Sequence, residues 1–210
     1  MKIEQILRLH KSMHGWCSEA KSRSLLFQAK EIGAKTIVEI GVYGGKSFMV
    51  LAAAAKITKG IAYGIDPYTN LAATEAEPQG AENTDWWSKI DMAAIQKSAR
   101  DFLEKQSGLN AWFEFMFITA NQALPYFHLI GVDFLHIDGN HSRWCSTRDV
   151  LNWLPMVKPG GIIAFDDADW NSTELARAFL NEKGKLIETI PQSQTEGGSE
   201  CQIFQMNKES

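Results

Sequence analysis

Acidic residues end two apolar runs near the middle of this 210-residue chain. Asp138 closes the run 132–137, and Asp166 with Asp167 closes the run 161–165. Carboxylates held close together repel one another unless a cation or protons intervene, and oxygen ligands of this kind suit a hard divalent cation such as Mg2+. The simpler alternative is that each acid caps the helix that follows it.

These acids can meet only if the two runs are neighbouring strands. A helical stretch at 142–156 and a turn at 157–161 separate the runs, so the pattern predicts a right-handed βαβ unit with parallel strands. Ligands of an open parallel sheet lie beyond the carboxyl ends of its strands, where all three acids would stand. His141 lies three residues past Asp138, in a loop from which its ring could reach the same site. A lone loop histidine is more often a surface residue, so both interpretations stay open.

A strand, a glycine-rich loop and a helix precede this unit. The apolar run 36–40 enters the loop 41–47, with the sequence GVYGGKS, and the helix-favouring stretch 48–57 follows. Such a helix N-terminus suits an anionic or polar ligand. A Walker-type phosphate loop would need its first glycine one residue earlier, and the dinucleotide fingerprint lacks its second glycine. The remaining candidates are a nucleoside-binding loop, with Glu39 as its acid two residues before Gly41, and a tight turn without a ligand.

Asp66 ends the next apolar run, 61–65, which Pro67 stops. An acid at the end of the second strand of a doubly wound sheet can accept hydrogen bonds from ribose hydroxyls. A helix cap or a turn is the alternative role. Because the glycine-rich loop precedes it, the ribose role is favoured.

Three further runs complete the predicted sheet. The run 112–118 is the third strand, and 185–190 and 201–206 are the last two. No helix fits between the last two, so they should pair as a hairpin and add an antiparallel strand. We therefore predict an α/β fold with a Rossmann-like, doubly wound seven-stranded sheet, mostly parallel, with one antiparallel strand in a C-terminal hairpin.

The sequence predicts a single domain, 1–210. Two of its segments do not follow the alternation of strands and helices. Residues 2–33 read as N-terminal helices, and 68–89 is a long polar segment that fits a lid-like insertion. Trp86 and Trp87 within this segment suit either a flap over a substrate or anchors of the next helix.

Composition excludes several classes of protein. The net charge is −4 and no run of Lys or Arg stands out, so no nucleic-acid partner is expected. No apolar run is long enough for a membrane span, and the charged N-terminal stretch is unlike a secretory signal. The three cysteines have no metal-type spacing, which favours reduced thiols and a cytoplasmic location.

These motifs together resemble a known family. The stretch 38–47 resembles the first motif of class I S-adenosylmethionine-dependent methyltransferases, Asp66 falls where their ribose-binding acid lies, and 154–161 resembles the turn before their fifth strand. The segments 137–142 and 165–167 are similar to the macrocin-type O-methyltransferases, which resemble cephalosporin-biosynthesis methyltransferases and bind a divalent metal.

The resemblance implies a cofactor, a metal and an acceptor. It implies S-adenosyl-L-methionine bound by Glu39, Gly41, Tyr43, Gly44, Ser47, Asp66, Asn121 and Asp138. It also implies Mg2+ or a similar divalent cation held by Asp138, Asp166 and Asp167. Asp138 or His141 would take the proton from a hydroxyl of a small molecule of the sugar, polyketide or phenol type.

Two other functions stay open from the sequence. One is a P-loop-like, nucleotide-dependent phosphotransferase, with the loop 41–47 as a degenerate phosphate cradle. The other is a non-catalytic protein that binds a nucleoside. The sequence fixes neither the methyl acceptor nor whether the chain forms a homo-oligomer.

Overall fold

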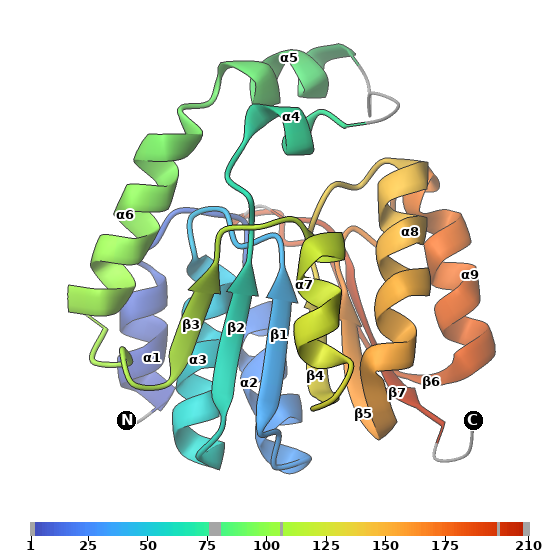
Figure 1. Cartoon of the computed structure of the whole chain (residues 1–210). Coiled ribbons are helices and arrows are strands. Elements are labelled where there is room, and N and C mark those ends of the chain that lie inside the picture. The colour runs from blue at the N-terminus through green and yellow to red at the C-terminus, as the bar shows by residue number, and fades with distance from the viewer. Residues whose placement is uncertain (1–2, 76–80, 106, 197, 208–210) are drawn as a thin grey trace.

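A seven-stranded sheet runs through the computed structural model, which describes residues 3–75, 81–105, 107–196 and 198–207 (Figure 1). The strand order is β3-β2-β1-β4-β5-β7-β6, and β7 runs antiparallel to both of its neighbours. The strands are β1 (Thr36–Ile40), β2 (Ile61–Ile65), β3 (Phe113–Met116), β4 (Val132–Ile137), β5 (Val157–Phe165), β6 (Gly184–Ile190) and β7 (Cys201–Met206). The predicted mostly parallel sheet with one antiparallel strand is confirmed.

Helices cover both faces of the sheet (Figure 1). One face packs against α1 (Ile3–His10), α2 (Glu19–Glu31), α3 (Lys46–Thr58) and α6 (Met92–Lys105). The other packs against α7 (Ala120–Phe127), α8 (Arg143–Trp153) and α9 (Glu174–Lys183). Successive strand residues serve opposite faces, so Ile37 joins the first core and Val38 the second. Two short 3-10 helices, η1 (Leu154–Met156) and η2 (Asn171–Thr173), lead into β5 and α9.

The order of the strands fixes where a ligand can bind. The chain leaves β1 toward β2 on one side, whereas β4 and β5 lie on the other side of β1. The loops that follow β1 and β4 therefore diverge at the carboxyl edge of the sheet, which is the usual ligand site of a doubly wound fold.

The segment 68–89 contains two helices where the sequence predicted a polar loop. α4 (Asn70–Ala73) and α5 (Ala81–Lys89) lie beyond the carboxyl edge of the sheet (Figure 1). The hydroxyl of Thr69 caps α4 by accepting a hydrogen bond from the Ala72 amide at 3.2 Å. Residues 76–80 of the predicted lid lie outside the described residues.

Among the predicted boundaries, those of the helix 142–156 and of the strand after it shift most. The predicted helix 142–156 ends as α8 at Trp153 and tightens into η1. β5 begins at Val157, earlier than predicted, because Val157 pairs with Val132 across an irregularity in the β4–β5 ladder.

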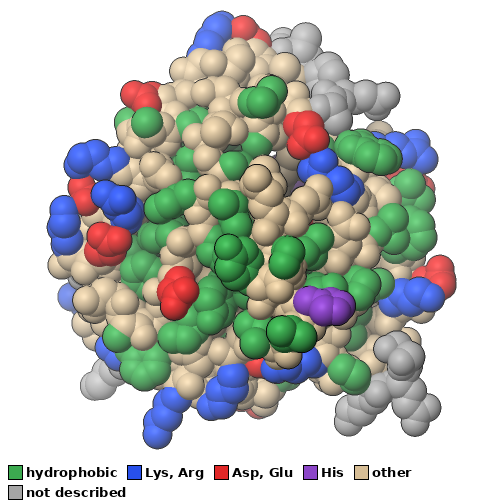
Figure 2. Space-filling model, viewed as in Figure 1, with side chains coloured by type: hydrophobic (Ala, Val, Ile, Leu, Met, Phe, Trp, Pro, Cys, Tyr) green, Lys and Arg blue, Asp and Glu red, His purple; other side chains and the backbone are tan. Residues whose placement is uncertain are grey.

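The surface of the face that carries α7 is rich in apolar side chains. Figure 2 shows hydrophobic side chains across the middle of this face, with charged residues toward its edges. Tyr126 and Ile130 are exposed there, and Leu129 is 90% exposed. An apolar patch of this kind is typical of a contact surface, so formation of a homo-oligomer stays a prediction. Among the described helices, none combines the length and apolarity needed to cross a membrane.

Candidate active site

The loop after β1 is fixed by close backbone contacts. Gly41 has φ of 85°, and a Cβ built there would lie 2.0 Å from the Asp138 carbonyl oxygen. Only glycine fits this backbone conformation next to this neighbour. Gly44 likewise lies against the carbonyl of His14. The loop therefore joins the carboxyl end of β1 to the loop after β4 and to the connection between α1 and α2.

Asp66 at the end of β2 holds this loop from the other side. Its Oδ2 accepts hydrogen bonds from the Val42 amide at 3.0 Å and the Tyr43 amide at 2.9 Å, and its Oδ1 accepts one from the Tyr68 amide at 2.7 Å. Burial raises the pKa of Asp66, and these hydrogen bonds oppose the rise. Each carboxylate oxygen can accept more than one hydrogen bond, so the ribose contact predicted for Asp66 remains compatible with this arrangement.

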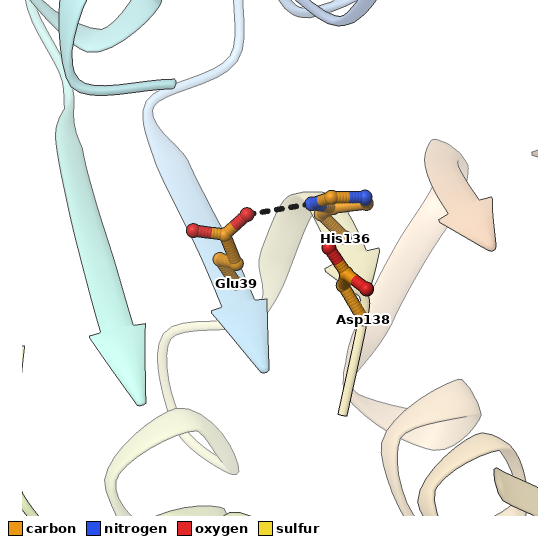
Figure 3. Close-up of side chains that lie close together, drawn as sticks. All are labelled: Glu39, His136 and Asp138. Atoms are coloured by element: carbon orange, nitrogen blue, oxygen red, sulfur yellow. Dashed lines mark hydrogen bonds and ion pairs between the residues drawn. The ribbon is translucent and has the colours of Figure 1, made fainter. Parts of the chain in front are cut away.

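Glu39 lies in the core of the sheet and does not contact the cavity. It pairs in register with His136 on β4, and its Oε1 lies 2.7 Å from His136 Nδ1 (Figure 3). Both side chains are fully buried. Burial raises the pKa of Glu39, and His136 opposes the rise. The Glu39 side chain therefore points toward β4, its cofactor contact stays a prediction, and the prediction that His136 is a core residue is confirmed.

Asn121, whose cofactor contact also stays a prediction, lies near the start of α7. Thr119 caps α7, and its hydroxyl accepts a hydrogen bond from the Gln122 amide at 3.3 Å. Because α7 begins here, the side chain of Asn121 points toward α8, where its Oδ1 accepts a hydrogen bond from Asn152 Nδ2 at 2.9 Å. Thr119 and Ala120 line the cavity in its place.

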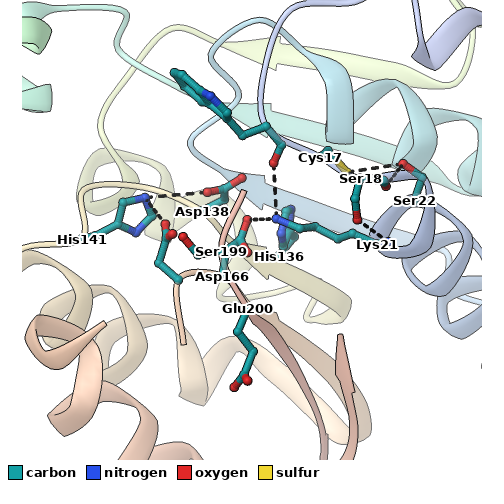
Figure 4. Close-up of polar contacts among 12 residues, drawn as sticks. Cys17, Ser18, Lys21, Ser22, His136, Asp138, His141, Asp166, Ser199 and Glu200 are labelled. Carbon is teal, nitrogen blue, oxygen red and sulfur yellow. Dashed lines mark hydrogen bonds and ion pairs between the residues drawn. The ribbon is translucent and has the colours of Figure 1, made fainter. Parts of the chain in front are cut away.

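The three predicted metal ligands follow the carboxyl ends of β4 and β5 and all line one cavity. Figure 4 shows two of them, Asp138 and Asp166, close to each other. Asp138 and Asp166 follow the alternation of their strands and face the α2 side of the sheet. Asp167, the next residue, would face the other way. Its φ of 51° is left-handed and turns its carboxylate back, so that Oδ2 lies 2.6 Å from His141 Nε2. Burial and the charge of Asp166 raise the pKa of Asp138 well above its ordinary value.

His141 stands between two of these carboxylates. Its Nε2 lies 2.6 Å from Asp167 Oδ2 and 3.8 Å from Asp138 Oδ1, and its ring lies 5.5 Å from that of Trp170. Burial lowers the pKa of His141, but the charge and hydrogen bond of Asp167 outweigh burial and raise it. Burial alone would raise the pKa of Asp167, but the charge and hydrogen bond of His141 outweigh burial and lower this pKa to about 2. The short contact with Asp167 therefore stabilises the protonated form of the His141 ring.

Lys21 enters the same cluster from α2, although the sequence analysis did not single it out. Its ammonium pairs with Asp166 Oδ2 and donates a hydrogen bond to the Trp16 carbonyl at 3.4 Å (Figure 4). The spacing of Lys21 from the apolar residues of the same helix could have indicated that it is buried. Lys21, Leu25 and Ala29 recur at helical spacing, and all three are buried.

A cavity of about 460 Å³ joins the glycine-rich loop to the carboxylate cluster. Most of the predicted site residues line it: Gly41, Tyr43, Ser47, Asp66, Asp138, His141, Asp166 and Asp167. Glu39, Gly44 and Asn121 are not among the lining residues. The cavity thus connects the predicted cofactor loop to the predicted metal and base residues.

Aromatic rings form the wall of the cavity opposite the sheet. Trp16 stacks on Tyr43 with ring centroids 5.3 Å apart, and Trp87 packs edge-on against Tyr43 at 5.5 Å. Trp86 packs against Trp16 at 5.5 Å and against Trp87 at 4.8 Å. Trp16, Trp86 and Trp87 all line the cavity. Both tryptophans of α5 therefore line the cavity, and Trp87 also packs against the core. The segment formed by α4 and α5 is called the flap below, and its closure over a substrate stays a prediction.

Asn140 and Arg148 tie this flap to the loop after β4. The Asn140 amide nitrogen donates to the carbonyls of Ala72, Ala73 and Glu75, each at 3.1 Å. Arg148 on α8 binds the carboxylate of Glu75 through both terminal nitrogens, at 2.8 and 3.2 Å. The position of α4 is thus coupled to the loop that carries Asp138 and His141.

Comparison with known proteins agrees with this geometry. A family model described as a methyltransferase domain matches residues 38–168, which is more than half of the chain. The chain therefore belongs to the methyltransferase-domain family, and the resemblance to class I methyltransferases is confirmed.

Several solved structures share the fold. The O-methyltransferase TomG of Streptomyces achromogenes, involved in tomaymycin synthesis and solved with S-adenosylmethionine, has 17% identity and a TM-score of 0.64 over 98% of this chain and 89% of that chain. A Bacillus cereus O-methyltransferase with S-adenosylhomocysteine has 16% identity and a TM-score of 0.62, covering 98% and 90%. Cofactor-bound Rv0187 from MTB has 16% identity and a TM-score of 0.65, covering 99% and 90%. At these identities the likeness shows the fold.

Proposed function

We propose that this chain transfers the methyl group of S-adenosylmethionine to a hydroxyl oxygen of a small molecule, assisted by a divalent cation. The observation that carries the proposal is the single cavity that joins the glycine-rich loop and Asp66 to the cluster of Asp138, His141 and Asp167. Methyl transfer is an in-line displacement, so donor and acceptor must share one site at about 3–3.5 Å between the reacting atoms.

The cofactor would occupy the side of the cavity formed by the loop after β1. Asp66 holds the Val42 and Tyr43 amides, and it lines the cavity at the end of β2, where ribose hydroxyls are recognised in doubly wound folds. Ser47 near the start of α3 also lines the cavity. The family match supports this assignment, as do the S-adenosylmethionine and S-adenosylhomocysteine bound by the similar O-methyltransferases.

The donor set of the cluster fits a hard divalent cation such as Mg2+. Asp138, His141 and Asp167 each offer a ligand atom, and these atoms lie within 4.8 Å of one another. Oδ1 of Asp166 is buried and has no hydrogen-bond partner among the described side chains and backbone. Carboxylate oxygens are the ligands that Mg2+ prefers, so Asp138, Asp166 and Asp167 would hold it. A bound Mg2+ lowers the pKa of a coordinated hydroxyl.

The proton of the acceptor would pass to His141 or Asp138. His141 must first be neutral, and its short pair with Asp167 favours the protonated ring. A divalent cation that binds the Asp167 carboxylate would free the His141 imidazole from this pair. The pKa of His141 would then fall, and the neutral ring could act as a base. Asp138 lies 3.8 Å from the same ring and is the second acceptor at hand.

The alternatives from the sequence receive less support. The family match favours a methyltransferase over a nucleotide-dependent phosphotransferase. His141 beside two carboxylates favours an enzyme over a non-catalytic nucleoside binder. The acceptor stays a small molecule with a hydroxyl of the sugar, polyketide or phenol type.

Ligand binding provides the first test, because a ligand that binds the folded state raises its unfolding temperature. S-Adenosylhomocysteine should raise it and ATP should not, with or without Mg2+. Methyl transfer from S-adenosylmethionine to a panel of sugars and phenols should then stop with a chelator and in Asp138→Asn. Asp101→Asn on α6 is the matched control, because Asp101 pairs with the exposed lysines Lys97 and Lys105 at 2.7 and 2.8 Å, away from the cavity. Stabilisation by ATP alone would reject the proposal, and full transfer with a chelator would reject its metal part.

A further inference from the structure

A lysine is buried inside the carboxylate cluster. Lys21 is 2% exposed, and its ammonium pairs with Asp166 Oδ2 and with the Trp16 carbonyl. Burying an ammonium is costly unless an opposite charge and hydrogen bonds compensate. The ion pair with Asp166 therefore holds the lysine ammonium inside the carboxylate cluster.

Basic side chains reach the cluster from two sides. Figure 4 shows Lys21 reaching Asp166 from one side and His141 reaching Asp138 and the neighbouring carboxylate from the other. His141 contacts Asp167 at 2.6 Å, so it is a partner that a cation can displace. Lys21 is fixed by α2, which packs against the sheet through Leu25 and Ala29. Its charge cannot leave when a cation arrives.

Asp166 is shared between this fixed charge and the space in front of it. Oδ2 is occupied by Lys21, whereas Oδ1 is buried and has no partner among the described residues. A carboxylate held this way offers one oxygen to a cation. Its charge is already partly balanced, so it attracts that cation less strongly than a free carboxylate would.

We propose that Lys21 is a resident counter-cation that sets the affinity of the cluster for a divalent ion. The inference rests on the metal part of the proposed function. The ammonium orients Asp166, keeps the carboxylates assembled when no ion is bound, and repels an incoming ion. The ion is therefore held more weakly than the same carboxylates would hold it without Lys21.

The test separates the charge of Lys21 from its hydrogen bond. Lys21→Gln keeps a donor but removes the charge, and Lys21→Arg keeps the charge. Lys30→Gln is the matched control, because Lys30 lies on the same helix with its side chain 54% exposed and pairs with Glu31. Calorimetry with Mn2+ should show that Lys21→Gln binds the ion at least about tenfold more tightly than the parent, because a buried like charge is gone. Lys21→Arg and Lys30→Gln should keep the parent affinity. Equal or weaker binding in Lys21→Gln would overturn the inference.

Stability gives a second readout that also covers failure to fold. Without an ion, Lys21→Gln leaves Asp166 without a charge partner, so Mn2+ should raise its unfolding temperature more than that of the parent. If Lys21→Gln does not fold alone, Mn2+ should restore the fold, because binding energy then becomes folding energy. An equal rise in both proteins, or no rescue by Mn2+, overturns the inference.

The outcomes distinguish this inference from the proposed function. Absence of S-adenosylhomocysteine binding in the parent rejects the methyltransferase assignment. Absence of Mn2+ binding in every variant rejects the metal part and this inference together. Binding of Mn2+ by the parent with no gain in Lys21→Gln rejects the inference alone.

Discussion

Replacing Gly41 by alanine should separate the two loops that form the site. A Cβ at Gly41 would lie 2.0 Å from the Asp138 carbonyl oxygen and 2.8 Å from the Gly139 Cα. Ordinary contact begins at 3.4 Å, so the Asp138 backbone would have to retreat by about 1.4 Å. The φ of 85° adds about 1–2 kcal/mol for any residue with a Cβ. Because the neighbour is backbone on a packed strand end, we expect a total loss of about 3 kcal/mol or more.

Gly33→Ala is the matched control for this prediction. Gly33 has φ of 64°, but a Cβ there would meet nothing within 4 Å. It therefore carries the conformational strain without the clash, and should lose only about 1–2 kcal/mol. Urea unfolding measures both losses, and calorimetry with S-adenosylhomocysteine should show lost affinity in Gly41→Ala alone. A Gly41→Ala variant that is as stable as Gly33→Ala and binds S-adenosylhomocysteine like the parent would contradict the predicted clash.

Three further predictions concern single side chains. Burial raises the pKa of Asp149 to about 7 and Arg148 opposes the rise, so the folded state holds this proton more tightly than the unfolded state; its ionisation removes stability as pH rises from about 4 to about 7. Asp149→Asn should therefore gain stability relative to the parent between pH 5 and pH 8, by about 2–3 kcal/mol in urea unfolding, because about two units of the pKa shift lie within this window. An equal stability difference between variant and parent at both pH values would contradict this. Asn140→Ala should speed hydrogen exchange in α4, because three hydrogen bonds to its end are lost, while Asn121→Ala should not; protection unchanged in both would refute the tie. Asp66→Ala should weaken S-adenosylhomocysteine binding by about 1–3 kcal/mol in calorimetry, and unchanged affinity would remove Asp66 from the site.

The sheet and the meeting of its acids were predictable because they depend on regular spacing. A strand that ends in Asp138 and a parallel neighbour that ends in Asp166 bring both carboxylates to one edge whatever the side chains around them. Asp66 at the end of β2 follows from the same rule. The glycine-rich loop was also recognisable, since the strained turn at Gly41 admits only glycine.

The remaining site residues depend on local turns and on partners far along the chain. The left-handed backbone of Asp167 brings it to His141, and no pattern in the strand predicts that turn. Lys21 was overlooked because a lysine on a helix usually extends into solvent, and its partner lies 145 residues away. Glu39 matches a motif position, and its register with His136 gives it a buried partner that the motif does not indicate.

The polar composition of the segment 68–89 concealed its helices. α4 has only four residues and depends on the Thr69 cap and on Asn140 from the loop after β4. Intrinsic propensity is a weak guide for so short a helix, because tertiary contacts provide most of its stability.

The central claim is that one cavity holds the methyl donor beside the carboxylate cluster. The most direct measurement is the relaxation of the 13C-labelled methyl group of S-adenosylmethionine bound to the protein, recorded with Mn2+ and with Mg2+. A paramagnetic ion at Asp138 and Asp167 should strongly broaden the methyl signal, and Asp138→Asn should remove the broadening while the cofactor stays bound. A methyl signal that stays sharp while both Mn2+ and S-adenosylmethionine are bound to the parent would contradict the account, because the two sites would then be separate.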